Sequence, residues 1–489
     1  MSEVLAPPLS YGFAKQHGVV VLSLDEPVTV GLREGADPMA LAEARRVIGQ
    51  AFTVEHLSKA AFDKHLSELY AAASTGAGDL DMVEDLDTLA GELPTADVLD
   101  TQDDAPVIRL INGVLAEAVR RGASDIHVEP YESALLVRIR IDGVLREALR
   151  LPARVTATLV SRIKVMARLD IAERRIPQDG RISIALGGRT LDVRVSTLPS
   201  RAGERVVMRI LDREQANLTM EQLGMSRAVL SAYQGALREP NGIVLVTGPT
   251  GSGKTTTLYA GLQALNDSTR NILTIEDPVE YAIDGVGQTQ VNTKVGMTFA
   301  AGLRAILRQD PDVVMVGEIR DGETAQIAVQ ASLTGHLVLS TVHTNDAPGA
   351  ITRLRDMGVE PFLLASTLRL VLAQRLVRKL CLACRRAEPA EAAAARAIGI
   401  APGQPIHRAI GCAQCSHTGY AGRVGVYEVL RVDERVRRRI AENADESLLA
   451  ESAFSEGAPT LAASARAAVA EGLTTAEEAF RVTRQDAQE

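Results

Sequence analysis

The sequence predicts a multidomain α/β protein whose largest part is an α/β domain with a phosphate-binding loop. Three observations predict this class. A complete phosphate-loop motif occupies residues 248–255, strand and helix patterns flank it, and 489 residues are too many for one ordinary domain. We expect a small N-terminal domain over residues 1–73, an acidic flexible linker over 74–105, an α+β domain over 106–225, an α/β core over 226–377, a tetracysteine subdomain over 378–425 and C-terminal helices over 426–489.

The N-terminal domain is expected to be a docking domain, because nothing in it indicates catalysis. Its residues predict a strand at 19–22 and helices at 40–48 and 52–70. The linker that follows has no Lys or Arg between Lys64 and Arg109, and such an acidic stretch repels itself and stays extended. An acidic docking motif is the alternative interpretation of this stretch.

Charge is distributed unevenly along the chain. The net charge is −9, yet residues 1–104 alone carry 6 Lys and Arg against 19 Asp and Glu. This balance argues against nucleic-acid binding by the N-terminal region. The chain has no stretch of about 18 uncharged apolar residues and no basic-then-apolar signal pattern, so we expect a cytoplasmic protein without a membrane span.

Hydrophobic spacing predicts the elements of the α+β domain. Helical spacing covers 107–118, and alternation predicts a strand at 137–141 that Asp142-Gly143 turns into a hairpin. We also expect a helix at 159–169, a second hairpin around Gly187-Gly188 and a strand at 204–211. The strand faces carry arginines that are either solvated or directed at the γ-phosphate of a nucleotide in a neighbouring domain or subunit: Arg181, Arg189, Arg194, Arg205 and Arg209.

The phosphate loop lies between a predicted strand at 243–246 and a predicted helix at 256–265. Its glycines let successive N–H groups face phosphate oxygens, and the helix N-terminus adds partial positive charge. Lys254 would reach the β- and γ-phosphates, and Thr255 would hold Mg²⁺. The flanking elements argue against a chance glycine-rich turn. The expected nucleotide contacts are Gly248, Pro249, Thr250, Gly251, Ser252, Gly253, Lys254, Thr255 and Thr256.

Carboxylates and histidines mark the ends of further predicted strands. The strand at 271–275 ends in Glu276 and Glu280, and the strand at 313–316 ends in Gly317-Glu318. Ligands bind at the carboxyl ends of such strands. The strand at 313–316 resembles the second nucleotide-site strand of phosphate-loop enzymes, in which an aspartate is common where this chain has Gly317. Glu318 or a water would then serve Mg²⁺. His336 and His343 bracket a last predicted strand at 337–342, either as γ-phosphate sensors or as histidines satisfied by backbone partners.

The four cysteines form two Cys-x-x-Cys knuckles separated by residues 385–411. Two such knuckles can complete a tetrahedral four-thiolate zinc site, which is closed and therefore structural. The long separation is tolerated because the entropy of loop closure grows slowly with length. Redox pairs are the alternative, but they need no second knuckle. The predicted zinc ligands are Cys381, Cys384, Cys412 and Cys415.

The order of these motifs resembles the secretion ATPase superfamily, over roughly residues 106–430. The stretch Leu9-Ser10-Tyr11-Gly12-Phe13-Ala14-Lys15-Gln16-His17-Gly18-Val19 resembles the opening of the general secretion pathway protein E family of type II secretion. Pilus retraction motors lack the cysteine knuckles, and pilus assembly ATPases are longer. Both differences favour a secretion motor over a pilus motor. The resemblance also implies a RecA-like phosphate-loop ATPase core, preceded by a PAS-like α+β domain.

The resemblance also implies roles for single residues. Lys254 and Thr255 would bind ATP and Mg²⁺, and Glu318 would place Mg²⁺ and water. Glu280 or Glu276 would orient or deprotonate the attacking water. The expected phosphate- or interface-contacting arginines are Arg194 and Arg209 of the α+β domain and Arg304 and Arg308 of the core.

Partners and location are likewise implied by the family. It suggests a homohexamer at the inner membrane, attached through docking of the N-terminal domain onto the cytoplasmic domain of type II secretion protein L. The inner-membrane platform protein F and acidic phospholipids are further expected contacts. Hydrolysis would extend a periplasmic pseudopilus and export folded proteins.

Three alternatives are weighed against this hypothesis. A pilus assembly motor would use the same chemistry with a different partner. A nucleic-acid machine would use the knuckles as a zinc ribbon, but Tyr420 is the lone aromatic near them, so we expect no nucleic acid. A nucleotide switch without turnover is disfavoured by the carboxylates near the phosphate loop.

Overall fold

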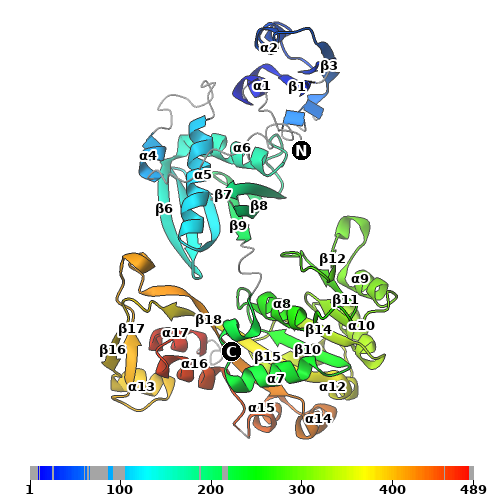
Figure 1. Ribbon diagram of the computed structural model, residues 1–489, viewed down its shortest axis with the longest axis vertical. Helices are drawn as coiled ribbons and strands as arrows, with labels where there is room; N and C mark the ends of the chain where they lie inside the picture. The colour runs from blue at the N-terminus through cyan, green and yellow to red at the C-terminus, as the bar shows by residue number, and fades with distance from the viewer. Residues whose placement is uncertain are drawn as a thin grey trace. The chain divides into compact units, whose positions relative to one another are not determined.

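The computed structural model describes residues 9, 11–24, 27–59, 61–62, 65–66, 86–91, 105–186, 189–211, 218–455 and 457–483 (Figure 1). The chain divides into two compact units, residues 1–212 and 213–489, each with its own cores. The predicted turn at Gly187-Gly188 and most of the predicted linker at 74–105 lie outside the described residues.

The first unit begins with a three-stranded sheet, in which β1 (Val19–Ser23) pairs antiparallel with β2 (Thr29–Arg33), and β2 pairs parallel with β3 (Thr53–Leu57). Helices α1 (Tyr11–His17) and α2 (Ala40–Ile48) accompany it. The predicted helix at 52–70 is wrong over β3. Thr53 and Val54 are β-branched and favour strand, and pairing with β2 supplies the hydrogen bonds.

A short helix, α4 (Leu86–Gly91), lies inside the segment predicted as an extended linker. Its Leu89 is buried and packs against Gly113 of helix α5 (Ala105–Arg120). The extended conformation predicted for the linker is therefore wrong at these residues, because apolar residues of α4 pack in the neighbouring core.

The α+β part of the first unit is an antiparallel six-stranded sheet with the order β6-β5-β4-β9-β8-β7. Helices α5 and α6 (Thr156–Met166) pack against it around one apolar core. The predicted hairpin turn is confirmed: Asp142 and Gly143 have φ of 49° and 85°, as a tight two-residue hairpin turn requires. The strands are β4 (Ala123–Pro130), β5 (Ala134–Ile141), β6 (Val144–Pro152), β7 (Gln178–Leu186), β8 (Arg189–Ser200) and β9 (Gly203–Leu211).

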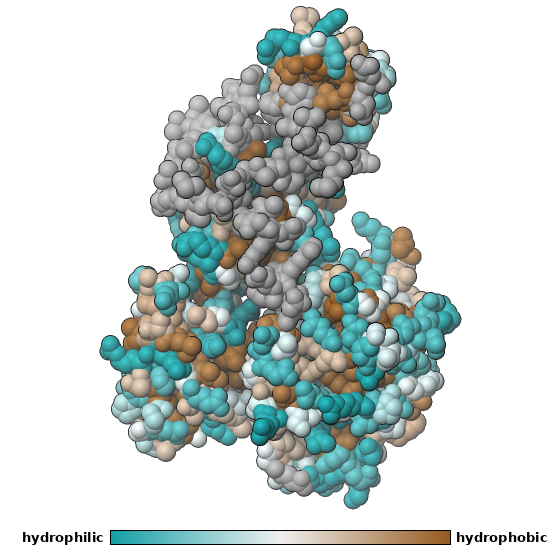
Figure 2. Space-filling model, viewed as in Figure 1, coloured by the Kyte–Doolittle hydropathy of each residue, from teal (hydrophilic) through white to brown (hydrophobic). Residues whose placement is uncertain are grey.

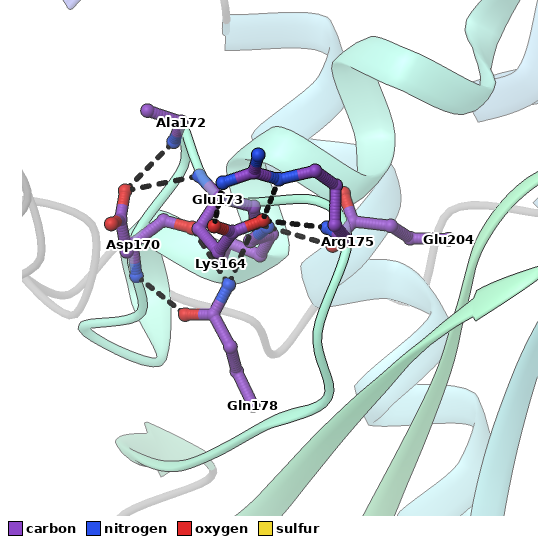
Figure 3. Close-up of polar contacts among 7 residues, drawn as sticks. All are labelled: Lys164, Asp170, Ala172, Glu173, Arg175, Gln178 and Glu204. Carbon is purple, nitrogen blue, oxygen red and sulfur yellow. Dashed lines mark hydrogen bonds and ion pairs between the residues drawn. The ribbon is translucent and has the colours of Figure 1, made fainter.

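A buried ion pair joins α6 to β9, and its lysine also holds the connection from α6 to β7 (Figure 3). Lys164, which is fully buried, lies 2.7 Å from Glu204 of β9 and donates to the Glu173 carbonyl at 2.6 Å. The Gln178 side chain adds hydrogen bonds to the backbone of Asp170 and Glu173. A buried charge of this kind is tolerated because each polar group around it is paired.

The second unit contains a seven-stranded sheet with the order β12-β11-β13-β14-β10-β15-β18, parallel except for β18. Alternate residues of β10 enter different cores: Ile243 and Leu245 pack in the core of α9, α10 and α11, and Val244 and Val246 pack in that of α7 and α8. The sheet is therefore covered on both faces. Its parallel strands are β10 (Gly242–Thr247), β11 (Ile272–Glu276), β12 (Gly287–Gln290), β13 (Val313–Val316), β14 (Leu337–Val342) and β15 (Leu368–Leu380). The helices that cover it are α7 (Arg227–Leu237), α8 (Lys254–Leu265), α9 (Phe299–Ile306), α10 (Gly322–Leu333), α11 (Ala347–Asp356) and α12 (Pro361–Thr367).

Two long strands follow the strand that was predicted to be the last, so that prediction is wrong. β15 pairs with β18 (Tyr420–Arg431) from Leu370 opposite Arg431 to Leu380 opposite Tyr420. The predicted boundaries at 377 and 425 fall inside these strands. The cysteine subdomain lies between them and contains β16 (Arg386–Pro389), α13 (Ala392–Ile398) and β17 (Pro405–Arg408).

The chain is helical after β18, as predicted, with α14 (Glu434–Ala441), α15 (Glu446–Phe454), α16 (Leu461–Ala470) and α17 (Ala476–Thr483). On the face of the second unit that Figure 2 shows, hydrophilic and apolar residues are interspersed. Among the described helices, none is both long enough and apolar enough to cross a membrane.

Candidate active site

The phosphate loop joins the end of β10 to the start of α8, as the sequence predicted. Gly248, Gly251 and Gly253 have φ of 145°, 79° and 87°, values that L side chains rarely adopt. A Cβ at Gly248 would lie 2.4 Å from the Gln374 carbonyl oxygen, so only glycine fits. The first amides of α8 have no partner within the helix, which leaves an anion-binding end. Thr255 is exposed in the first turn, and Thr256 is half-buried.

Lys254 is folded back onto its own loop. Its ammonium donates to the carbonyls of Gly248 and Pro249 at 2.8 and 3.1 Å, and only 9% of the residue is exposed. Burial lowers the pKa of Lys254 to about 8, a shift that Glu318 opposes and Arg375 reinforces. The side chain is therefore a poorly solvated cation at the position where phosphates would arrive.

Glu318, His343 and Lys254 form a line across the carboxyl ends of three adjacent strands. His343 Nε2 lies 3.3 Å from Glu318, and its Nδ1 lies 3.5 Å from the Lys254 ammonium. Burial, together with Lys254, lowers the pKa of His343 against the opposing effect of Glu318. The neutral ring can thus donate to Glu318 and accept from Lys254. Arg320 Nη2 completes the group at 2.5 Å from Glu318.

Glu276 is buried within a closed network. It accepts hydrogen bonds from Thr274 at 2.6 Å, from Gln288 at 3.1 Å and from Tyr259. Burial raises its pKa, although these hydrogen bonds oppose the rise. Tyr259 in turn accepts from the Glu280 amide at 3.3 Å. Through Tyr259, Glu276 therefore helps to fix the backbone segment that carries Glu280. The Glu280 side chain itself is half-buried.

His336 lies at the other end of β14 from the phosphate loop. β14 and β10 are parallel, with Leu337 opposite Gly242 and Val342 opposite Thr247. The His336 ring nitrogen Nδ1 lies 2.8 Å from the Ala331 carbonyl oxygen. The structure thus brings His343 to the loop but not His336, which has the backbone-satisfied environment of the alternative interpretation.

The core arginines predicted to contact phosphate lie at α9. Arg304 pairs with Glu323 of α10, and Arg308 donates to the Arg304 carbonyl at 2.9 Å. Both contacts are exposed, and neither involves the phosphate loop. Within this unit these arginines do not meet Lys254.

Arg194 and Arg209 lie opposite each other on β8 and β9, and Arg181 lies opposite Arg194 on β7. Arg209 is held by Asp125 of β4 at 2.9 Å. Burial would raise the pKa of Asp125, but hydrogen bonds led by that from Arg209 lower it overall. Among the described residues no ion pair involves Arg194, so its side chain is less constrained than that of Arg209.

The four cysteine sulfurs all lie within 4.8 Å of one another. Three of their separations are 3.8 to 3.9 Å. A regular tetrahedron of sulfurs about 2.3 Å from zinc has edges of about 3.8 Å, whereas a disulfide is about 2.05 Å long. The sulfur arrangement thus fits zinc and is not that of disulfides.

Backbone amides support this sulfur cluster. Amides of Cys412 and Gly419 donate to Cys415 Sγ at 3.2 Å, and the Gly411 amide donates to Cys384 Sγ at 3.3 Å. Burial disfavours the Cys415 thiolate, yet these amides help to lower its pKa to about 6. Burial raises the pKa of Cys384 to about 11 despite its amide. Donors of this kind suit sulfurs that carry negative charge.

Sequence reasoning missed several polar residues around the loop. Tyr259 lies on α8, Arg320 lies two residues beyond Glu318, and Gln374 and Arg375 lie on β15. A usable signal was present for the last pair, because two polar residues interrupt an otherwise apolar stretch between residues 370 and 377.

Comparison with known proteins identifies the family of this chain. The family model "Type II/IV secretion system protein" matches residues 100–481, and a domain model of "GSPII protein E" matches residues 8–70. The type II secretion system protein E of Klebsiella pneumoniae is 56% identical over 98% of this chain and 97% of its own length. The type II secretion system ATPase E of Vibrio cholerae is 54% identical over 91% of this chain and 90% of its own length.

Solved structures of a pilus retraction motor and of an ATPase share the fold. The pilus retraction motor PilT with bound ADP is 28% identical, with a TM-score of 0.51 over 76% of this chain and 95% of its own. The Legionella pneumophila ATPase DotB is 21% identical, with a TM-score of 0.58 over 77% of this chain and 96% of its own. The predicted multidomain α/β fold with a RecA-like core and a tetracysteine subdomain is thus confirmed. The chain belongs to the type II/IV secretion system protein family, and within it to the general secretion pathway protein E family of type II secretion ATPases.

Proposed function

We propose that this chain hydrolyses ATP to ADP and phosphate in order to power type II protein secretion. The observation that carries the proposal is the line formed by Glu318, His343 and Lys254 beside a complete phosphate loop. A chain that only bound nucleotide would need the loop, but it would not need a carboxylate, an imidazole and an ammonium aligned beside it.

The proposed division of labour follows the contacts of each side chain. Lys254 leaves the Gly248 and Pro249 carbonyls for the phosphates, where its charge is better compensated. Thr255 and Glu318 would hold Mg²⁺, which neutralises phosphate charge when bound. Glu280 is the better candidate to orient water, because the carboxylate of Glu276 already has three donors. His343 would report on the γ-phosphate through its contact with Lys254.

The arginines would act between domains or subunits. Because Arg304 and Arg308 do not reach the loop in their own unit, we propose that they serve a subunit interface in a homohexamer. Arg194 and Arg209 would compensate phosphate charge from the first unit, with Arg209 oriented by Asp125.

We further propose that Cys381, Cys384, Cys412 and Cys415 hold one structural zinc ion, which would fix the ends of β15 and β18. The N-terminal domain would dock onto the cytoplasmic domain of type II secretion protein L, and the motor would act on platform protein F. The chain would then work in the cytoplasm at the inner membrane, within reach of acidic phospholipids, and would drive pseudopilus assembly.

The experiment that tests ATP hydrolysis compares two lysine variants in the assembled complex. Lys254→Ala is expected to lower the turnover of ATP at least about a hundredfold, because developing phosphate charge loses its partner. The melting temperature should not fall, since a desolvated cation is removed. Lys294→Ala, at an exposed lysine of the same unit, is the matched control. Unchanged turnover in Lys254→Ala would overturn the enzyme proposal.

A further inference from the structure

Gln374 is a buried amide on β15, the strand that lies next to the phosphate-loop strand β10. Only 1% of the residue is exposed. A buried amide without hydrogen-bond partners would cost free energy at both its donor and its acceptor. The hydrogen-bond partners of the Gln374 side chain therefore indicate its role.

Both ends of the Gln374 side chain bond to the phosphate-loop region. Nε2 donates to the Ser252 carbonyl at 2.6 Å, just before Gly253. Oε1 accepts from the Thr257 hydroxyl at 2.8 Å, in the first turn of α8. One side chain therefore joins the two positions that enclose Lys254 and its neighbours.

The glycines of the loop also pack against Gln374. A Cβ at Gly248 would lie 2.4 Å from the Gln374 carbonyl oxygen, and a Cβ at Gly253 would lie 3.2 Å from its Nε2. The first and last glycines of the motif thus rest on the backbone and on the side chain of this one residue.

The contact with Ser252 has a consequence for the next amide. In a trans peptide the C=O of one residue and the N–H of the following residue point in opposite directions. The bond to Gln374 directs the Ser252 carbonyl toward β15, so the Gly253 N–H points away from β15. Phosphate-binding loops use backbone amides that face the phosphates.

We propose that Gln374 is a positioning residue of the phosphate loop, which orients the Ser252–Gly253 peptide so that its N–H faces the bound phosphates. The proposal rests on nucleotide binding as part of the proposed function. Gln374 acts through the backbone and does not itself touch the nucleotide. Its removal should therefore weaken binding more than it weakens the fold.

The test measures the affinity of the full-length protein for ADP with Mg²⁺, together with its melting temperature. Gln374→Met removes both hydrogen bonds at similar volume and should weaken ADP binding at least tenfold. Thr257→Val removes the bond to Oε1 but leaves the bond from Nε2 to Ser252, and it should change affinity less than threefold. Thr367→Val, which removes a hydrogen bond from the buried Thr367 to the Leu363 carbonyl before β15, should lower the melting temperature without changing affinity.

A second variant covers poor folding of Gln374→Met. Gln374→Glu keeps an acceptor for Thr257 but, when ionised, has no donor for Ser252, so ADP affinity should fall at neutral pH. Lower pH should restore part of it, because a protonated carboxyl can donate again. A role in packing alone would show no such pH dependence.

The outcomes separate this inference from the proposed function. If the wild-type chain does not bind ADP, the proposed function fails and this inference fails with it. If the wild type binds and Gln374→Met and Gln374→Glu bind equally well at pH 7, only the inference is overturned.

Discussion

Lys254 shows how the surroundings of one residue set its chemistry. Its ammonium faces the carbonyls of its own loop, with little solvent. Burial lowers its pKa from 10.5 to about 8. Because the neutral form is favoured in the fold, the unfolded chain binds more protons between these two pH values. Lys254 therefore makes the free energy of unfolding rise with pH across this window.

The same pKa predicts a pH dependence of nucleotide binding. ADP affinity should be nearly constant below about pH 8 and fall by about tenfold per pH unit above it, because binding then requires uptake of a proton. Affinity measured by calorimetry between pH 7 and 9.5 checks this. Lys254→Met should bind weakly with no comparable slope. A wild-type affinity that stays flat to pH 9.5 would contradict the assignment.

The two histidines show what could be predicted about the site and what could not. In a parallel sheet the residue after a strand lies at the ligand-binding edge, and the residue before it lies at the opposite edge. Glu318 and His343 follow their strands and reach the loop, whereas His336 precedes its strand and does not. Sequence spacing found both histidines, but only strand direction distinguishes them.

At the scale of elements, the sequence predicted those turns and loops whose backbone conformation is set by their own residues. The phosphate loop and the Asp142-Gly143 turn were predicted because glycine positions specify their backbone. β3, β15 and β18 were missed because distant pairing partners stabilise them. In β15 the buried Gln374 and Arg375 also interrupt the apolar pattern.

The cysteine cluster lies between the end of β15 and the start of β18. We predict the effect of losing one of its four sulfurs. Cys412→Ser should reduce zinc from about one ion per chain to nearly none and lower the melting temperature, because three thiolates hold the ion less well than four. Metal analysis of protein purified without chelator measures this. Gln414→Ala, at an exposed residue of the same turn, should keep its zinc. Equal zinc content in both variants would contradict the proposed four-thiolate site.

At the scale of the whole molecule, the chain separates charge and chemistry between its units. Residues 1–104 hold 19 of the acidic groups and 6 basic ones, while the phosphate loop and the cysteine cluster lie in the second unit. Composition predicted this asymmetry without structural knowledge. It does not predict the geometry of the contact proposed between a nucleotide and Arg194 and Arg209, because that contact would depend on the assembled protein.

The whole chain also determines which inner-membrane partner it binds. The full-length chain should capture the cytoplasmic domain of a type II secretion protein L and not its pilus counterpart, and removal of residues 1–104 should abolish capture. The expected location of the contact follows from the match of residues 8–70 to the GSPII protein E domain model. Lys254→Ala should bind normally, which separates docking from hydrolysis. Capture of the pilus counterpart alone would keep the catalytic proposals but change the machine.

The pairing of β15 with β18 also bears on how such motors diversify. The chain leaves the sheet after Leu380 and re-enters it at Tyr420, which pairs with Leu380. In the sheet, β15 and β18 therefore form one antiparallel hairpin, and the residues between them are its loop. Lengthening such a loop costs little entropy. The inserted residues share a core with α16 and α17, through Ala395, Ile398 and Ile406. Evolution can therefore replace this insertion without redesigning the nucleotide edge, provided that it replaces the two C-terminal helices along with it.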